Sequence, residues 1–207
     1  MIDMQLIAVS VRAVIAYLLG SVNTAIIISA LSGKDIRKEG SGNAGATNTL
    51  RVMGKKAAAM VALFDGLKGV LAILAARMVS VLFGADSNAP VCFSALAVML
   101  GHVYPVYFGF KGGKGIMTTT AVMFMLDWRI GLTVFVICIT VMLTTKYVSL
   151  GSCIGAVLFP VLIIIFHWGN FVLAAVSVAI GALALFKHRS NIQRLLNGTE
   201  SKLNFKK

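Results

Sequence analysis

Charged residues are scarce in this sequence, since Asp, Glu, Lys and Arg together make up 13% of its 207 residues. A soluble globular domain usually carries about 25%, so an ordinary soluble protein is excluded. Hydrophobic residues reach 58%, and the mean hydropathy is +0.91. These values predict an all-α polytopic membrane protein whose length leaves no room for a separate soluble domain. We therefore expect residues 1–207 to form a single membrane domain.

Cysteines are also few, and they exclude two kinds of site. Cys92, Cys138 and Cys153 lie inside apolar runs and share no CxxC or Cys/His spacing, so neither a disulfide framework nor a metal site is predicted. A removable signal peptide is not predicted either, because the N-terminus lacks a basic leading region and a small-residue cleavage site. The N-terminal residues are expected to remain as the first helix.

Apolar runs separated by charged connectors divide the chain. They cover residues 4–31, 56–83, 90–108, 116–126, 130–144, 148–166 and 170–186. This pattern predicts about seven transmembrane helices. Because the fourth and fifth runs are short for a bilayer core about 30 Å thick, the alternative is five full spans plus a short hairpin around Asp127.

Lys and Arg concentrate in alternate connectors, and cytoplasmic loops are enriched in these residues. The basic side receives Lys34, Arg37, Lys38, Arg51, Lys55, Lys56, Lys68, Lys111, Lys114, Lys146, Lys187, Arg189, Arg194, Lys202, Lys206 and Lys207. This bias predicts an outer N-terminus and a cytoplasmic C-terminus, with Trp128 and Trp168 as anchors at the outer interface. The net charge of +12 does not by itself indicate an anionic substrate, since anionic lipids also favour a basic cytoplasmic face.

Three segments on the basic side are rich in small and polar residues. The first polar segment, residues 40–51, reads GSGNAGATNTLR. Its small residues allow the backbone to approach an anion, and its arginine adds a planar fork suited to phosphate. The side chains predicted to bind substrate here are Ser41, Asn43, Thr47, Asn48 and Arg51. The alternative is a flexible polar loop with a helix cap.

The second polar segment, residues 109–115, reads GFKGGKG. It fails the nucleotide-binding pattern G-x-x-x-x-G-K-[ST], because it is one residue too short and Gly115 stands where a hydroxyl is needed. Its glycines still allow backbone contact with an anion, and Lys111 and Lys114 add positive charge at the start of a helix. The alternative is a basic cytoplasmic turn.

The third polar segment, residues 187–200, reads KHRSNIQRLLNGTE and predicts a short amphipathic helix. His188, Asn191 and Arg194 are three residues apart and fall on one face of that helix, and Glu200 follows it. The alternative is a juxtamembrane helix that binds anionic lipid.

Two polar features fall inside or beside apolar runs. Asp65 and Lys68 have the i,i+3 spacing of an ion pair, which a membrane tolerates because each charge neutralises the other. We expect this pair to be structural, with support of a functional site as the alternative. His102 is expected to pack between helices, and the alternative is that it orients a lysine.

The predicted topology places the three polar segments on one membrane face, so they are expected to line one pocket. Many anion donors beside apolar helix ends suit a phosphorylated polar molecule together with an acyl chain. A transporter or flippase for a phosphorylated solute or lipid is the competing hypothesis. It would predict binding sites near the midplane and paired broken repeats.

The motifs SGNAGATNTLR, DGLKG, GHVYPVYFGFKGGKG and KHRSNIQRLLNGTE occur in this order across nearly the whole chain. Together they resemble the acyl-phosphate:glycerol-3-phosphate acyltransferase family. The resemblance implies a bacterial inner-membrane enzyme with a cytoplasmic active site. It would transfer a fatty acyl group from acyl phosphate to the 1-hydroxyl of sn-glycerol 3-phosphate, giving lysophosphatidic acid and phosphate, as the first step of phospholipid synthesis.

The resemblance also implies partners. Acyl phosphate and glycerol 3-phosphate would be the substrates, membrane lipids would surround the enzyme, and association with the enzyme that forms acyl phosphate is a further expectation. No metal, cofactor or nucleic acid is expected. The HxxxxD pattern of soluble-type glycerolipid acyltransferases does not begin at any of the three histidines, which disfavours acyl-CoA or carrier-protein chemistry.

By position, the resemblance assigns roles to individual residues. Phosphate would be bound by Ser41, Arg51 and one or both of Lys111 and Lys114. His188 and Asn191 would lie near the glycerol, with Arg194 also binding substrate and Glu200 at the edge of the pocket. The residues predicted to be catalytic are Ser41, Arg51, Lys111, Lys114, His188 and Asn191. Either His188 or an oxygen of the donor phosphate would take the hydroxyl proton, and the resemblance favours the phosphate.

Overall fold

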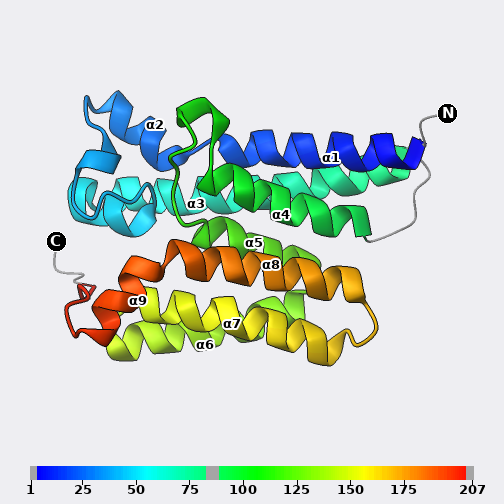
Figure 1. Cartoon of the computed structure of the whole chain (residues 1–207). Helices are drawn as coiled ribbons and strands as arrows, with labels where there is room; N and C mark the ends of the chain where they lie inside the picture. The colour runs from blue at the N-terminus through cyan, green and yellow to red at the C-terminus, as the bar shows by residue number, and fades with distance from the viewer. Residues whose placement is uncertain (1–3, 83–88, 204–207) are drawn as a thin grey trace. The chain divides into compact units, whose positions relative to one another are not determined.

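The computed structural model describes residues 4–82 and 89–203, and in these ranges the chain is helical without a β-strand (Figure 1). The helices are α1 (Met4–Ser21), α2 (Thr24–Leu31), α3 (Ala46–Leu82), α4 (Ala89–Val103), α5 (Ile116–Leu126), α6 (Trp128–Thr145), α7 (Val148–Phe166), α8 (Phe171–Lys187) and α9 (Arg189–Leu196), with two 3-10 turns, η1 (Ile36–Lys38) and η2 (Val106–Phe108). They form two compact units, unit 1 (Met1–Val122) and unit 2 (Met123–Lys207). The single membrane domain stays a prediction.

Five helical segments are long and apolar enough to cross a membrane. These are Ile7–Leu31, Ala46–Leu82, Val91–Phe108, Trp128–Thr145 and Val148–Phe166. A sixth span results if α8 and α9, which meet at a bend of 60°, count as one. The all-helical, multi-span prediction is therefore confirmed, whereas the number of seven spans is not. The two apolar runs that are short in the sequence, 116–126 and 130–144, correspond to α5 and α6. Helix α5 has 11 residues, too few to span a membrane, whereas α6 has 18.

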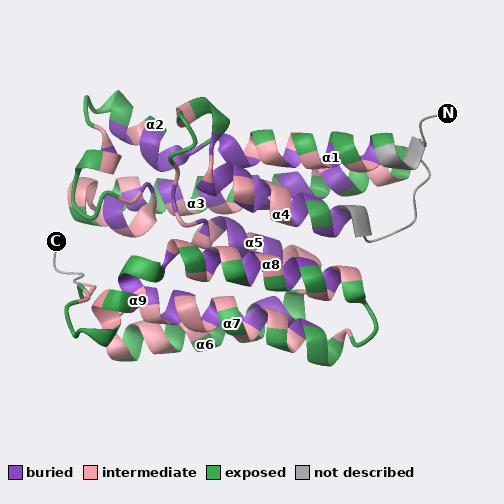
Figure 2. Ribbon diagram, viewed as in Figure 1, coloured by how far each residue is buried: buried purple, intermediate pink, exposed green. Residues whose placement is uncertain are grey.

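Large apolar side chains are exposed along the helices of both units, as expected for surfaces that face lipid tails rather than water. Examples are Leu63 and Met78 in α3, Val136 in α6 and Ile165 in α7. Figure 2 shows exposed positions recurring along most helices between buried ones. The burial pattern thus agrees with a membrane protein, while the orientation of the chain across the membrane stays a prediction.

Close backbone contact between α1 and α4 holds unit 1 together. A Cβ at Gly20 would overlap the carbonyl oxygen of Val98, and a Cβ at Gly101 would overlap that of Tyr17. Small residues let membrane helices approach this closely. Close packing matters in a membrane because there is no hydrophobic driving force between helices that lipid already surrounds. The Tyr17 hydroxyl also donates to the Tyr104 carbonyl oxygen at 2.8 Å. These contacts fix the end of α4, from which the second polar segment continues.

A break divides α3 near the start of its span. Gly54 has φ 84° and ψ −176°, which are not helical values, and a positive φ of this size strains any residue with a Cβ. The break leaves a short helix, residues 46–53, before the long apolar helix of residues 55–82. The short helix contains the end of the first polar segment, including Arg51.

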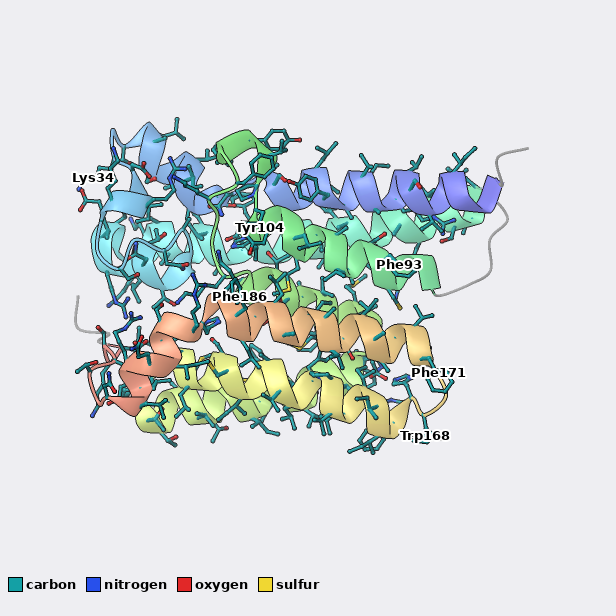
Figure 3. The ribbon with its side chains drawn as sticks, viewed as in Figure 1. Lys34, Phe93, Tyr104, Trp168, Phe171 and Phe186 are labelled. Atoms are coloured by element: carbon teal, nitrogen blue, oxygen red, sulfur yellow. The ribbon has the colours of Figure 1, made fainter. Side chains whose placement is uncertain are left out.

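In unit 2, α6, α7 and α8 pack in chain order and α9 folds back onto α7 and α8. At one end of the unit, Asp127 accepts hydrogen bonds from the N–H groups of Arg129 and Ile130 and lies 2.7 Å from His167 Nε2. Burial alone would raise the pKa of Asp127, but these hydrogen bonds and the charge of His167 lower it overall. Trp128 and Trp168 are exposed at this end, and Figure 3 labels Trp168 at the turn between α7 and α8.

The backbone contact at Gly101 predicts that Gly101→Ala destabilises the protein by at least the ~1–3 kcal/mol typical of overpacking, because the added methyl must displace backbone. Thermal denaturation in detergent measures this change. The matched control is Gly66→Ala in α3, where an added Cβ meets nothing within 4 Å and alanine favours the helix. Equal melting temperatures for the two variants would contradict the prediction.

Candidate active site

The first polar segment is shaped from within by Asn48. Its Oδ1 accepts from the Ser41 N–H at 2.8 Å, and its Nδ2 donates to the carbonyl oxygens of Ile36 and Glu39 at 3.2 and 2.9 Å. Asn48 is fully buried, and a Cβ at Gly40 would overlap its Oδ1. Both N–H bonds of the amide are therefore used inside the protein. The Asn48 amide thus fixes the turn that presents Ser41, and the substrate contact predicted for Asn48 stays a prediction.

The other predicted side chains of this segment are more accessible. Ser41 and Arg51 are exposed, and Asn43 and Thr47 are half-buried. Within residues 4–82 and 89–203, no hydrogen bond or ion pair engages the Ser41 hydroxyl or the Arg51 guanidinium. An unpaired guanidinium beside neutral donors can bind a phosphate or carboxylate. The geometry thus allows the phosphate-binding role predicted for Ser41 and Arg51.

The second polar segment caps α4. The N–H groups of Gly112 and Gly113 donate to the carbonyl oxygens of Val103 and His102 at 3.2 and 3.3 Å. These two N–H groups satisfy carbonyls that a helix end leaves unpaired, so they are not offered to an anion as the sequence suggested. Lys111 is exposed and has no ion-pair partner in the described part of the chain. Lys114 is half-buried and already interacts with another group. Lys111 is therefore the better candidate to bind an anion.

The first two polar segments meet within unit 1. A Cβ at Gly113 would overlap the carbonyl oxygen of Ala44, so only glycine permits this approach. Arg37, which pairs with Asp35 at 2.9 Å, also donates to the Phe108 carbonyl oxygen at 3.2 Å. Unit 1 therefore brings together two of the segments that the sequence assigned to one pocket.

The ion pair predicted between Asp65 and Lys68 is confirmed, with Nζ and Oδ1 2.9 Å apart and both side chains buried. His102 does more than pack between helices, since its Nδ1 lies 2.8 Å from Lys68 Nζ. Its burial agrees with the predicted packing between helices, and its contact with the buried Lys68 fits the alternative that it orients a lysine.

The third polar segment, in unit 2, is organised by Glu200. Its Oε1 accepts from the Ser149 hydroxyl and from Asn191 Nδ2, and its Oε2 pairs with Arg194 Nε, all at 2.7 Å. The Glu200 side chain is only 6% exposed. Burial would raise its pKa, but these hydrogen bonds and the Arg194 charge lower it below the ordinary value. Glu200 and Arg194 thus pair with each other, and the substrate contacts predicted for both residues stay a prediction.

Ser149 is the residue of this cluster that the sequence interpretation missed. It lies in the first turn of α7, three residues after Lys146 on the predicted basic side. That position was the signal that could have identified it. The Leu203 N–H also donates to the Lys146 carbonyl oxygen at 2.8 Å. These contacts hold the segment after α9 against the start of α7.

His188 ends α8 with a defined ring orientation. Its Nδ1 lies 2.8 Å from the Ala184 carbonyl oxygen, and a carbonyl oxygen only accepts hydrogen bonds. Nδ1 therefore carries the proton in the neutral ring, which leaves the lone pair on Nε2. The side chain is almost fully buried, as is that of Asn191 three residues later. The joint pocket of all three segments stays a prediction.

Comparison with known proteins gives a consistent result over most of the chain. A family profile described as glycerol-3-phosphate acyltransferase matches residues 10–198. A glycerol-3-phosphate acyltransferase of Thermoanaerobacter pseudethanolicus is 47% identical over 192 residues, which cover 92% of this chain and 93% of the relative. One from Clostridioides difficile is 41% identical over 205 residues, covering 99% and 100%.

Solved structures are similar as well. The chain matches a crystal structure of PlsY, an integral membrane glycerol 3-phosphate acyltransferase, in its glycerol 3-phosphate form, with a TM-score of 0.86 and 37% identity. The match covers 95% of this chain and 96% of the other. The lysophosphatidic acid form of PlsY matches with a TM-score of 0.83 and 36% identity over the same shares.

The low pKa of Glu200 predicts a loss of stability in acid. A lowered folded-state pKa gives stability above the unfolded value of ~4.3, and this stability is lost as the pH falls through the folded pKa. Glu200→Gln is expected to lower the melting temperature at pH 7 and to reduce its further fall below about pH 4. Thermal denaturation between pH 3 and 7 measures both effects. Glu39→Gln, at an exposed carboxylate, is the control and should follow the unmodified protein.

Proposed function

The chain belongs to the glycerol-3-phosphate acyltransferase family and is an integral membrane enzyme that acylates glycerol 3-phosphate, and we propose that its acyl donor is an acyl phosphate. The acyl group would pass to the 1-hydroxyl, giving lysophosphatidic acid and inorganic phosphate. The motif resemblance supports this donor, and the lysophosphatidic acid form of the related PlsY structure supports this product. The reaction would be the first step of phospholipid synthesis.

The observation that carries the proposal is the unpaired charge at one end of unit 1. Arg51 and Lys111 are exposed cations on two segments that meet at Ala44 and Gly113, and Ser41 adds a neutral donor. Acyl phosphate is a mixed anhydride with a good leaving group. Binding and neutralising both phosphates, that of the acyl donor and that of glycerol 3-phosphate, would therefore supply much of the catalysis through positioning and electrostatics.

The roles proposed for unit 2 rest on the motif resemblance and on local geometry. Asn191 is held by Glu200, and the lone pair of the neutral His188 ring is on Nε2. We assign both residues to the glycerol, where the lone pair on His188 Nε2 would accept a hydrogen bond from a hydroxyl other than the reacting one. An oxygen of the donor phosphate would take the proton as the bond to the acyl carbon forms, and phosphate would leave with the bridging oxygen.

The proposed location is the bacterial cytoplasmic membrane, with the polar segments on the cytoplasmic side. The concentration of Lys and Arg in the connectors of the polar segments supports this orientation. Acyl phosphate and glycerol 3-phosphate would reach the enzyme from that side and from the inner leaflet. Association with the enzyme that forms acyl phosphate belongs to the same proposal.

Phosphate release tests the donor. Purified protein in nanodiscs is expected to release phosphate from palmitoyl phosphate only when glycerol 3-phosphate is present, with one lysophosphatidic acid formed per phosphate. Palmitoyl-CoA should give no product under the same conditions. Product from palmitoyl-CoA but not from palmitoyl phosphate would overturn the donor assignment. Movement of glycerol 3-phosphate into liposomes without any product would instead favour the transporter hypothesis.

Arg51→Ala is expected to lower kcat/KM about 100-fold or more, as expected when one donor to a developing oxyanion is removed. Arg51→Lys should retain part of the activity, because it keeps the charge but loses the planar fork. Initial rates at varied concentrations of both substrates measure these effects. Lys34→Ala removes an exposed cation from the turn after α2, labelled in Figure 3, and should behave as the unmodified enzyme. Equal losses for Arg51→Ala and Lys34→Ala would indicate a general effect of charge.

A further inference from the structure

A closed polar cluster lies inside the apolar part of unit 1. Lys68 Nζ is 2.9 Å from Asp65 Oδ1, 2.7 Å from the Val22 carbonyl oxygen and 2.8 Å from His102 Nδ1. An ammonium has three N–H bonds, and each of these contacts accounts for one. The Thr24 hydroxyl donates to the other charged partner, Asp65 Oδ1, at 3.2 Å. The cluster is therefore fully hydrogen-bonded at its charged centre.

The cluster determines the protonation of His102. As the ammonium that pairs with Asp65, Lys68 has donors only, so His102 Nδ1 accepts the hydrogen bond at 2.8 Å. The ring is therefore neutral and carries its proton on Nε2. A cationic ring would bring two positive charges into direct contact in a buried site, which is strongly unfavourable.

The opposite edge of this ring faces the polar segments. A Cβ at Gly113 would overlap both His102 Nε2 and the Ala44 carbonyl oxygen, so these two atoms lie on the same side of Gly113. The His102 carbonyl oxygen accepts from the Gly113 N–H at 3.3 Å. The ring and the backbone of one histidine thus adjoin the point where the first and second polar segments meet.

We propose that Asp65, Lys68 and His102 form a positioning relay for the anion site of unit 1. Lys68 fixes the tautomer and orientation of the His102 ring, and the ring fixes Gly113 against Ala44. The relay thereby sets the distance between the two polar segments. The first carries Ser41 and Arg51, and the second carries Lys111. None of the three residues touches substrate. The inference rests on the phosphate-binding role proposed for these two segments.

Stability alone is a weak reason for this ion pair. A buried ion pair is costly to desolvate, and well-packed apolar residues of similar volume often replace one without loss of stability. Asp65 and Lys68 are 2% and 6% exposed. The Asp65–Lys68 pair orients the ring of His102. A pair of apolar residues could not do this, because it would offer no hydrogen bond to the ring.

The tautomer can be measured without any assay of activity. The full chain, labelled with ¹⁵N-histidine and placed in nanodiscs, has three histidines, so His167→Gln and His188→Gln assign the His102 signals. The unmodified protein should show a neutral His102 protonated on Nε2. The double variant Asp65→Leu/Lys68→Met removes both charges together and should give a mixture of tautomers. A cationic or Nδ1-protonated His102 in the unmodified protein would overturn the relay.

Binding of glycerol 3-phosphate then tests the positioning role. The double variant is expected to melt at a lower temperature, because Val22, Thr24 and His102 lose hydrogen-bond partners. Where it remains folded, it is expected to bind glycerol 3-phosphate about 10-fold or more weakly, since small misplacements of binding groups have effects of this size or larger. Isothermal titration calorimetry measures the Kd. A folded double variant with unchanged affinity would overturn the proposal. Because no acyl donor is present, failure of the acyl-phosphate assignment would leave this test unaffected.

Two replacements of His102 separate its two ring nitrogens. His102→Gln places an N–H near the Nε2 position, whereas His102→Asn places an acceptor near the Nδ1 position. If the contact toward Gly113 and Ala44 is what matters, His102→Gln should retain more affinity and a higher kcat/KM than His102→Asn. A purely structural histidine would show losses that follow the melting temperature alone, and that result would contradict the relay.

Discussion

The ion pair between Asp65 and Lys68 is the interaction on which the arrangement of unit 1 depends. Its carboxylate accepts from Thr24 at the start of α2, its ammonium contacts His102 near the end of α4, and the backbone oxygen of Asp65 accepts from Thr118 in α5 at 2.8 Å. A charge inside a membrane must be neutralised at short range. The ends of these helices therefore cannot move away from α3 without leaving a charged or polar group unpaired.

Paired and unpaired charges divide the polar residues into two kinds. Arg194 pairs with Glu200, and Arg37 pairs with Asp35, so these residues shape the loops and the segment after α9. Arg51 is exposed, and within the described ranges it has no such partner. Because a phosphate must compete with any carboxylate already bound, an unpaired guanidinium is the better anion site. The same residue type thus builds the scaffold at one position and is available to substrate at another.

Local patterns were sufficient to predict the apolar helices, the i,i+3 pair of Asp65 and Lys68, and the three polar segments. They could not show which polar side chain finds a partner far along the chain. Ser149 donates to Glu200, which lies 51 positions later in the sequence. The Asn48 amide donates both of its N–H bonds to a turn that forms only in the folded chain. The length of α5 was visible in the sequence, but the number of spans depends on how α8 and α9 bend, which composition does not determine.

Gly54 separates two chemical environments within one helix. A Cβ there would meet nothing within 4 Å, so glycine is needed for its positive φ and not for space. On one side, residues 55–82 must suit lipid, and on the other, residues 46–53 include Arg51, for which we propose phosphate binding. The break lets the direction of the short helix be set by the Asn48 turn rather than by the tilt of the long one. Adaptation to a thicker or thinner bilayer can therefore change the long helix without redirecting Arg51.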